Sequence, residues 1–449
     1  MQDTITRPKR MRRSPRPRLR VRRVIFVLLL ILIPILWHFR PSIPELVCGF
    51  PARGEQLWVR AEGFFTAADD AFAMRLPSKV TCWRWYGTEA WTLRLPKPDL
   101  TGWRLDTVEK DWNGRAFSVA PGGVWSAVAW ADGPRVRVIT WHKGQVKGRL
   151  TFPVSADGPF TGRAAFRVMA LDDGRAALWL ASAPVSPILV IEGNRMLATA
   201  EHRSKLTMER GIVYERVLSP DMRRLIGFKR PWISAQRDGV SVTPPDMECA
   251  SLELTRTELA IYQQYTVKHI DQPILFNGAV VGGNGAVFRQ RGEADAPDGW
   301  TVAAGVEPQP DCAVQYKDTS ARVIAPASMQ DWGVPRARQS WRVAISEGGR
   351  FALAYDASAR RSAGQSNRSS TWEVLTSVLF TPRRLNLYER PGRLIRAMKL
   401  PNSRQTVRSA YLSPDADRVL MRVVDVSTHK MKYLLYRMPP EVRRALNRE

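Results

Sequence analysis

Five histidines are the residues of this chain best suited to acid–base or metal chemistry. They are His38, His142, His202, His269 and His429, and no two are spaced to bind one ion from a single helix or hairpin. A fold can still bring distant side chains together, so this spacing alone excludes only local motifs. It therefore predicts no zinc-hydrolase helix.

Three short motifs match signatures of chemistry without the companions that the chemistry needs. Ser427-Thr-His-Lys430 has the Ser-x-x-Lys spacing of penicillin-binding enzymes, but Lys-Thr-Gly is absent and the tetrad falls in an expected hairpin. Gly282-Gly-Asn-Gly285 is not followed by the helix of a phosphate loop. The acid pairs Asp172-Asp173 and Asp415-Ala-Asp417 could bind calcium, but they fall in turns, where Asp commonly hydrogen-bonds to the backbone. We expect no catalytic, cofactor or metal site, and a non-enzymatic protein is favoured over an enzyme.

An uncharged apolar segment, Val24–Phe39, follows a basic N-terminus. The first 23 residues carry ten Lys or Arg side chains and one acidic residue, in a chain whose net charge is +26. As a helix the segment would be about 24 Å long at ~1.5 Å per residue, shorter than a ~30 Å hydrocarbon core. Arg22, Arg23, Trp37 and Arg40 are flanks that suit the two interfacial layers. The pattern predicts one transmembrane helix, a signal anchor.

The positive charges before this helix set the expected orientation. They keep the N-terminus cytoplasmic, so the remainder of a single-pass membrane protein would lie in the periplasm or outside the cell. A cleaved signal peptide is the alternative, but residues 40–48 contain no small-x-small site. Because the basic tail directly precedes the apolar run, it favours membrane topology, and no nucleic-acid partner is expected.

Four cysteines would then lie in a compartment that permits disulfides. Cys48, Cys82, Cys249 and Cys312 allow three connectivities, of which Cys48–Cys82 with Cys249–Cys312 is the most local. Their spacing gives no metal site. Buried free thiols are the alternative to these disulfides.

A strand–turn–strand unit recurs beyond residue 50. Two close copies are Val217–Phe228 and Tyr411–Arg422, and looser copies are Ser118–Val128, Met169–Leu178 and Ala344–Leu353. In the turn, Pro sets φ at the first corner, Asp bonds locally and Gly accepts positive φ. Alternating apolar residues afterwards indicate the next strand.

These units resemble the Ser-Pro-Asp-Gly turns of WD40-like and TolB-like β-propellers, in which the turn joins the inner strands of a blade. The resemblance covers Gly87 to Met438, but Met222 and Ala416 stand where Gly is usual. It implies an all-β propeller and little about activity, because propellers host many functions. The turn spacing indicates about seven blades, with six or eight open, if one turn lies near Gly282–Gly285 and the first blade around Val80–Leu95.

The last unit is one strand short, and propellers commonly close by taking a strand from the other terminus. Leu57–Arg60 is the candidate for that strand, or else a strand of the first blade. The expected division is a cytoplasmic tail (1–23), the transmembrane helix (24–39), a linker (40–54), the propeller (55–438) and a polar tail (439–449).

We therefore expect a membrane-anchored, extracytoplasmic β-propeller that acts as a binding or scaffold module. Its partner would be a protein or an anionic polymer, since the chain beyond the anchor is also basic. The alternative is an extracytoplasmic hydrolase or lyase with its site in the central pocket of the propeller.

Overall fold

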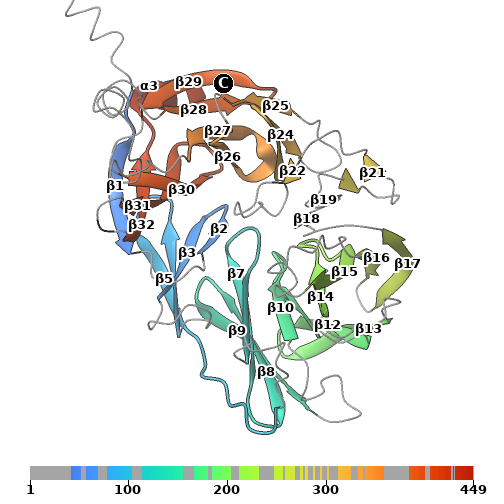
Figure 1. Cartoon of the computed structure of the whole chain (residues 1–449). Coiled ribbons are helices and arrows are strands. Elements are labelled where there is room, and N and C mark those ends of the chain that lie inside the picture. The colour runs from blue at the N-terminus through green and yellow to red at the C-terminus, as the bar shows by residue number, and fades with distance from the viewer. Residues whose placement is uncertain are drawn as a thin grey trace, which may run out of the picture. The chain divides into compact units, whose positions relative to one another are not determined.

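The computed structural model is all-β over the residues that it describes, apart from one short helix near the C-terminus (Figure 1). It describes residues 42–51, 57–68, 78–103, 114–154, 166–180, 185–203, 212–231, 247–255, 258–267, 274–276, 279–281, 287–288, 294–295, 301–302, 312–324, 332–336, 339–357, 384–399, 405–425, 428 and 430–447. The expected transmembrane segment and its flanks Arg22, Arg23, Trp37 and Arg40 lie outside these residues. Among the residues that are described, no helix has the length and apolar character needed to cross a bilayer.

The described strands form eight four-stranded antiparallel sheets, each built from strands that are consecutive in the chain apart from one exchange at the end. The first four sheets are β2 (Leu57–Arg60), β3 (Gly63–Ala68), β4 (Lys79–Arg84) and β5 (Glu89–Arg94); β6 (Arg115–Val119), β7 (Trp125–Ala131), β8 (Arg135–His142) and β9 (Gln145–Pro153); β10 (Phe166–Ala170), β11 (Arg175–Leu180), β12 (Val185–Glu192) and β13 (Arg195–Arg203); β14 (Ile212–Leu218), β15 (Arg224–Pro231), β16 (Met247–Leu254) and β17 (Leu259–Val267).

The remaining four sheets follow the same order until the last. They are β18 (Ile274–Phe276), β19 (Ala279–Val281), β20 (Val287–Phe288) and β21 (Ala294–Asp295); β22 (Thr301–Val302), β23 (Ala313–Lys317), β24 (Ser320–Ile324) and β25 (Trp332–Pro335); β26 (Trp341–Ile345), β27 (Phe351–Asp356), β28 (Arg384–Glu389) and β29 (Arg393–Lys399); β30 (Gln405–Leu412), β31 (Arg418–Asp425), β32 (Met431–Arg437) and β1 (Glu45–Pro51). A 3₁₀ turn, η3 (Glu347–Gly349), joins β26 to β27, and α3 (Pro440–Leu446) follows β32.

The last sheet takes its fourth strand from the beginning of the described chain. β1 pairs antiparallel with β32, from Glu45 opposite Arg437 to Pro51 opposite Lys432, and Figure 1 shows this blue strand beside the red C-terminal strands. The expected exchange between the two ends of the chain is therefore present. It uses residues placed in the linker 40–54, because Leu57–Arg60 is instead the first strand of the first sheet. Likewise α3 lies in the expected polar tail 439–449.

Burial explains why the inner strands are continuous apolar runs whereas the fourth strands alternate. β7 and β11 are buried at almost every residue, while β9 exposes most of its side chains. A strand covered on both faces needs apolar residues at every position, and one at the edge needs them only on the packed side.

Core clusters lie between consecutive sheets rather than within one sheet. One cluster joins the last sheet to the first through Leu435 and Phe64, and the next joins the first to the second through Phe65 and Val128. Further clusters join the second sheet to the third, the third to the fourth, the sixth to the seventh and the seventh to the eighth. Four-stranded meanders packed in chain order are the arrangement of propeller blades. The expectation of an all-β fold is confirmed, and the sheet packing agrees with a propeller.

The repeated turns occupy equivalent positions in their sheets. Those beginning at Ala120, Leu171, Ser219, Ser346 and Ser413 each join the first strand to the second. The span from Ser219 to Ser346, expected to hold one further blade, contains two short-stranded sheets, β18–β21 and β22–β25. The described residues therefore form eight units where about seven were expected. Gly282–Gly285 lies outside the described residues, so its expected turn stays a prediction.

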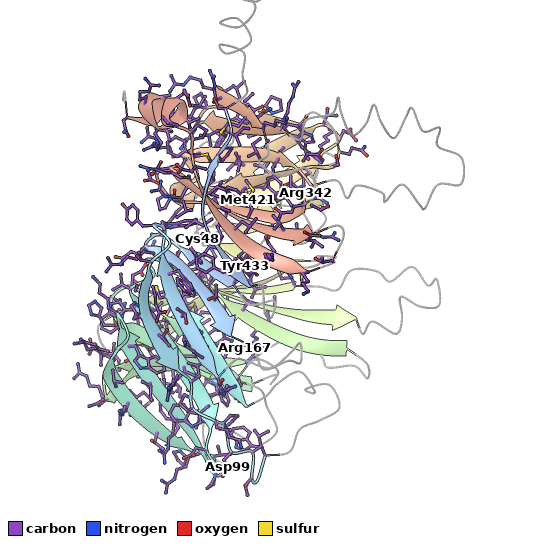
Figure 2. All side chains as sticks on the ribbon, turned by 90° about the vertical axis from the view of Figure 1, so that its left-hand side faces the viewer. Cys48, Asp99, Arg167, Arg342, Met421 and Tyr433 are labelled. Atoms are coloured by element: carbon purple, nitrogen blue, oxygen red, sulfur yellow. The ribbon has the colours of Figure 1, made fainter. Side chains whose placement is uncertain are left out.

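The four cysteines are free in the structure. Cys48 is half-buried on β1, while Cys82, Cys249 and Cys312 are buried in three other sheets. The local pairings Cys48–Cys82 and Cys249–Cys312 are therefore not formed. Figure 2 shows Cys48 where the blue strands of the first sheet approach the red strands of the last.

Candidate functional site

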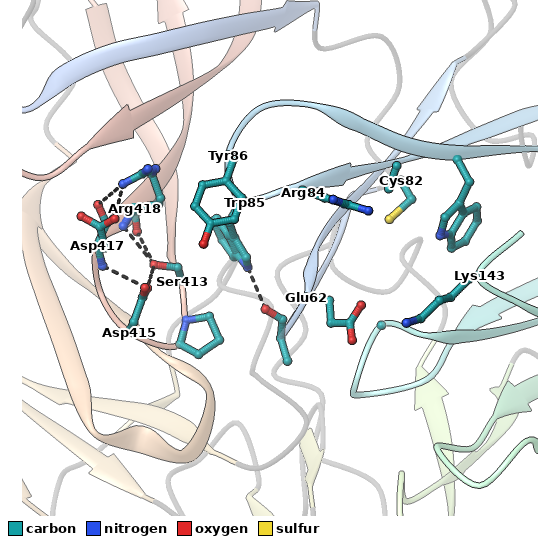
Figure 3. A pocket seen from close by; sticks show the side chains of 15 residues that line it. Glu62, Cys82, Arg84, Trp85, Tyr86, Lys143, Ser413, Asp415, Asp417 and Arg418 are labelled. Carbon is teal, nitrogen blue, oxygen red and sulfur yellow. Dashed lines mark hydrogen bonds and ion pairs between the residues drawn. The ribbon is translucent and has the colours of Figure 1, made fainter.

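A cavity of about 540 Å³ lies where the last, first and second sheets meet. Turns at one end of these sheets line it (Figure 3): the β2–β3 turn with Glu62, the β4–β5 turn with Tyr86, the β8–β9 turn with Lys143, and the β30–β31 turn that begins at Ser413. Because each wall is a turn held by a packed sheet, the position of the cavity is fixed by the packing of three successive units.

The Ser-Pro-Asp turn forms one wall and is rigid for a local reason. The buried Ser413 hydroxyl donates to Asp415 Oδ1 at 2.5 Å and accepts from the backbone N–H of Arg418 at 2.9 Å. Asp415 Oδ1 also accepts from the backbone N–H of Asp417 at 3.1 Å. Ala416 takes the positive φ of 55° that Gly usually supplies. The hydrogen bonds of Ser413 and Asp415 therefore stabilise the turn conformation that a glycine at position 416 would favour.

The fourth sheet repeats this turn with the same contacts. The Ser219 hydroxyl donates to Asp221 Oδ1 at 2.6 Å and accepts from the backbone N–H of Arg224 at 2.9 Å, and Met222 has a φ of 58°. The turn is thus a structural element of the repeat. Of these two copies, only the turn at Ser413 lines the described cavity. The Ser-Pro-Asp turn alone therefore does not define the cavity, and the residues of the neighbouring turns complete it.

Aromatic side chains cover the floor and rim of the cavity. Trp85 is buried and its indole N–H donates to the carbonyl oxygens of Arg60 and Ala61, at 3.2 and 3.0 Å, which ties the β2–β3 turn to β4. Trp91 is half-buried, while Tyr86 is 69% exposed. An exposed ring beside a cavity gives a ligand apolar contact together with a hydroxyl.

Charged groups of both signs surround the aromatic floor. The buried Arg418 guanidinium pairs with the Asp417 carboxylate and lies 5.5 Å from the centre of the Tyr86 ring. Glu62, Arg84 and Lys143 are exposed, and the described residues offer no hydrogen bond or ion pair to their charged groups. Figure 3 shows the Glu62 carboxylate and the Lys143 ammonium directed into the same part of the cavity. These groups are available to a ligand that carries both charges.

The thiol that lines this cavity is not activated. Burial and, to a smaller extent, the nearby Glu62 carboxylate raise the pKa of Cys82 to about 12, against a lowering effect of Arg84. At neutral pH the thiol stays protonated, and a protonated thiol is a poor nucleophile. The groups that the cavity offers to a ligand are therefore its aromatic and charged side chains rather than a reactive thiolate.

The acid pairs noted in the sequence have structural roles. Asp172 Oδ1 accepts from the backbone N–H of Gly122 at 2.8 Å, which links the second and third sheets, and Asp173 pairs with Arg175. Asp415 and Asp417 lie in the cavity wall. Within the described ranges no group of three potential metal ligands gathers. Ser427 and His429 of the Ser-x-x-Lys match lie outside those ranges.

Sequence reasoning did not identify Glu62, Arg84, Tyr86 or Lys143 as site residues. Glu62, Tyr86 and Lys143 are single turn residues, Arg84 is the last residue of β4, and no motif joins them. The only signal was indirect, because all four lie in or beside turns at the same end of adjacent units. Aligning the units by their turns would have grouped them.

Comparison with known proteins gives structural neighbours only. No protein-family model matches the chain, and no curated protein sequence is significantly similar to it. Similar solved structures include the β-propeller domain of Cps50 (Swd1) from Myceliophteria thermophila, with 11% identity over 88% of this chain and 99% of that one, at a TM-score of 0.36. Dihydro-heme d1 dehydrogenase NirN matches with 11% identity over 88% and 69%, at 0.37. The WD40 domain of SCAP from fission yeast matches with 9% identity over 89% and 94%, at 0.35.

Proposed function

We propose that this chain is a membrane-anchored, extracytoplasmic β-propeller of eight blades that binds a protein partner. The cavity between the last, first and second sheets carries the proposal. It combines an exposed tyrosine with unpaired charges of both signs on a rigid scaffold. Rigid aromatic anchors beside charged groups are typical of protein-binding surfaces.

The balance of charge favours a protein over an anionic polymer at this site. Three acidic side chains line the cavity, Glu62, Asp415 and Asp417, and three basic ones oppose them, Arg84, Lys143 and Arg418. A polyanion would meet like charges at the acidic side chains, whereas a peptide can offer both signs. We infer a partner segment with acidic and basic side chains close to an aromatic or aliphatic one.

The eight described sheets and the exchanged strand support the scaffold role. The pairing of β1 with β32 joins the two ends of the repeat array, and the cluster around Leu435 and Phe64 packs the last sheet on the first. An array joined in this way covers the edge strand that would otherwise be open to other chains.

The anchor and the orientation are supported by the sequence. Val24–Phe39 is apolar and uncharged, and ten basic residues precede it. A C-terminal tag on the full chain tests both. The tag should sediment with membranes after alkaline carbonate washing and be digested by protease added from the non-cytoplasmic side. A soluble product lacking the first ~40 residues would overturn the anchor, and a protected tag would overturn the orientation.

The binding site is tested by photocrosslinking from the cavity. The photoreactive residue p-benzoylphenylalanine at Tyr86 should give one discrete protein adduct in intact membranes. Glu62→Lys and Lys143→Glu should each reduce that adduct, because each removes a charge that faces the cavity and adds the opposite one. Lys97→Glu is the matched control, since Lys97 is also exposed but does not line the cavity. An adduct unchanged by both cavity variants would show that the partner does not use this site.

A further inference from the structure

The exposed large apolar side chains of the described residues are concentrated at one end of the sheets. Four of them, Leu46, Val146, Met196 and Leu394, are 43–55% exposed, and each is the second residue of the fourth strand of its sheet. They come from the last, second, third and seventh sheets. The same type of side chain at the same position in four units is a property of the repeat rather than isolated surface variation.

Two more exposed apolar side chains belong to this end. Ile43 is 45% exposed just before β1, and Val47 is 39% exposed on β1. Tyr86, in the turn that leads to the fourth strand of the first sheet, lines the cavity and is assigned to that site. Met431 is 38% exposed at the opposite end, at the start of β32. We call Ile43, Leu46, Val47, Val146, Met196 and Leu394 the apolar rim.

A β-bulge lies next to the rim position in six of the eight sheets, whereas the described residues of the fourth strands β21 and β25 show no register shift. In the last sheet Leu46 pairs with Tyr436 and Cys48 with Leu435, so Val47 has no partner. The same single-residue shift occurs in β5, β9, β13, β17 and β29. A bulge increases the local twist and redirects the neighbouring side chains. The shared bulge explains why equivalent residues are exposed together.

Contacts between sheets place these rim positions at a common end. The backbone N–H of Arg149 on β9 donates to Asn194 in the β12–β13 turn at 2.8 Å, which joins the second and third sheets beside Val146 and Met196. Gly87 in the β4–β5 turn lies against Val47 and Cys48 of β1. The helix α3, which follows β32 at this end, contacts β29 of the seventh sheet. The rim therefore continues over adjacent sheets.

The chain enters the first described strand at the same end. Only residues 40–42 separate Ile43 from the apolar segment Val24–Phe39, so Ile43 lies about 13 Å or less from Phe39 at ~3.3 Å per residue. If that segment spans a bilayer, the chain connection keeps Ile43, at this end of the sheets, close to the membrane surface. Exposed basic side chains adjoin the rim residues, among them Lys147 and Arg149 on β9 and Arg396 on β29.

We propose that the apolar rim is a lipid-contacting surface, with Leu46, Val146, Met196 and Leu394 entering the interfacial layer and the basic side chains meeting anionic phospholipid head groups. This inference rests on the membrane anchor of the proposed function. Single apolar side chains separated by Lys or Arg match shallow insertion into a lipid interface. A stable protein interface would instead need a contiguous desolvated centre. Contact at several points would fix the orientation of the sheets on the bilayer.

The test uses the full chain reconstituted in vesicles of phosphatidylethanolamine and phosphatidylglycerol. p-Benzoylphenylalanine replaces Leu46, Met196 or Leu394 in separate variants, and Met431 in the matched control. After irradiation, mass spectrometry of the digested protein measures peptides that carry one phospholipid. We expect several-fold more lipid adduct at each rim position than at position 431. All four positions are exposed, so the replacements leave the buried cores unchanged.

The outcomes separate the rim from the anchor. Carbonate-resistant protein without lipid adducts at the rim would overturn the rim proposal and leave the anchor standing. Equal adducts at position 431 would also overturn it, because the chain would then have no preferred face. A discrete protein adduct at the rim in cells, without lipid adducts in vesicles, would assign the surface to a protein. Protein that carbonate removes from the vesicles would overturn the anchor, and the rim proposal with it.

Discussion

Gly87 is the residue where one added methyl group should most directly disturb the junction between the first and last sheets. Its φ is +86°, and a Cβ at this position would lie 2.7 Å from Cys48 Sγ and 3.3 Å from Val47 Cγ1. Gly102 is a matched control, because its φ is +85° and a Cβ there would meet nothing within 4 Å. Both alanine variants pay for positive φ, whereas only Gly87→Ala overpacks the contact with β1.

The magnitudes follow from these two terms. Positive φ costs a non-glycine residue about 1–2 kcal/mol, which is the whole expected loss for Gly102→Ala. Overpacking adds about 1–3 kcal/mol, so Gly87→Ala should lose about 2–5 kcal/mol. Since the nearest atom is Cys48 Sγ, Cys48→Ala should restore part of that loss in the double variant.

Equilibrium urea unfolding of the full chain in mild detergent, followed by tryptophan fluorescence, measures these differences. The free energy of unfolding is compared for Gly87→Ala, Gly102→Ala, Cys48→Ala and the Gly87→Ala/Cys48→Ala pair. Equal losses for the two glycine variants would refute the steric reasoning. Additivity of the Gly87 and Cys48 changes would refute the assigned contact.

Two further predictions concern the repeat turn and the buried thiol. Ser413→Ala should lose about 2–3 kcal/mol in the same assay, because it removes a bond to a carboxylate and the acceptor of a buried N–H. Ser346→Ala, which removes only the N–H acceptor, should lose about 1–2 kcal/mol; equal losses would show that the carboxylate bond adds nothing. For Cys82, burial and then the Glu62 carboxylate raise the pKa from 9.0 to about 12, so the folded state keeps a proton that the unfolded state releases. Its contribution to stability should be complete below pH 9 and decline toward pH 12, and urea midpoints of Cys82→Ala should fall less steeply across that window than those of the unchanged chain.

The all-β class could be predicted because its signals are local. Proline, aspartate and glycine at fixed offsets define the turns at Ala120, Ser219 and Ser413, and all of these join the first two strands of a sheet as expected. The number of units was harder to predict. β18–β21 have only two or three residues each, too few to show a hydrophobic period.

The exchanged strand illustrates the same limit. Its existence followed from counting strands in the last unit, but its identity did not. Leu57–Arg60 and Glu45–Pro51 are both short and partly apolar, and either could pair with β32 on propensity alone. Packing decided between them, because β2 is required beside β3 in the first sheet.

By itself, the sequence determined the repeated turn, the apolar segment before residue 40 and the charge that precedes it, since each depends on neighbouring residues. Only the tertiary structure brought Glu62, Tyr86 and Lys143 to one cavity and aligned Leu46 with Met196 on one rim. Both groupings arise when equivalent ends of successive sheets pack together. Such packing depends on cores shared between units, and residues far apart in the chain carry no local mark of which units they will join.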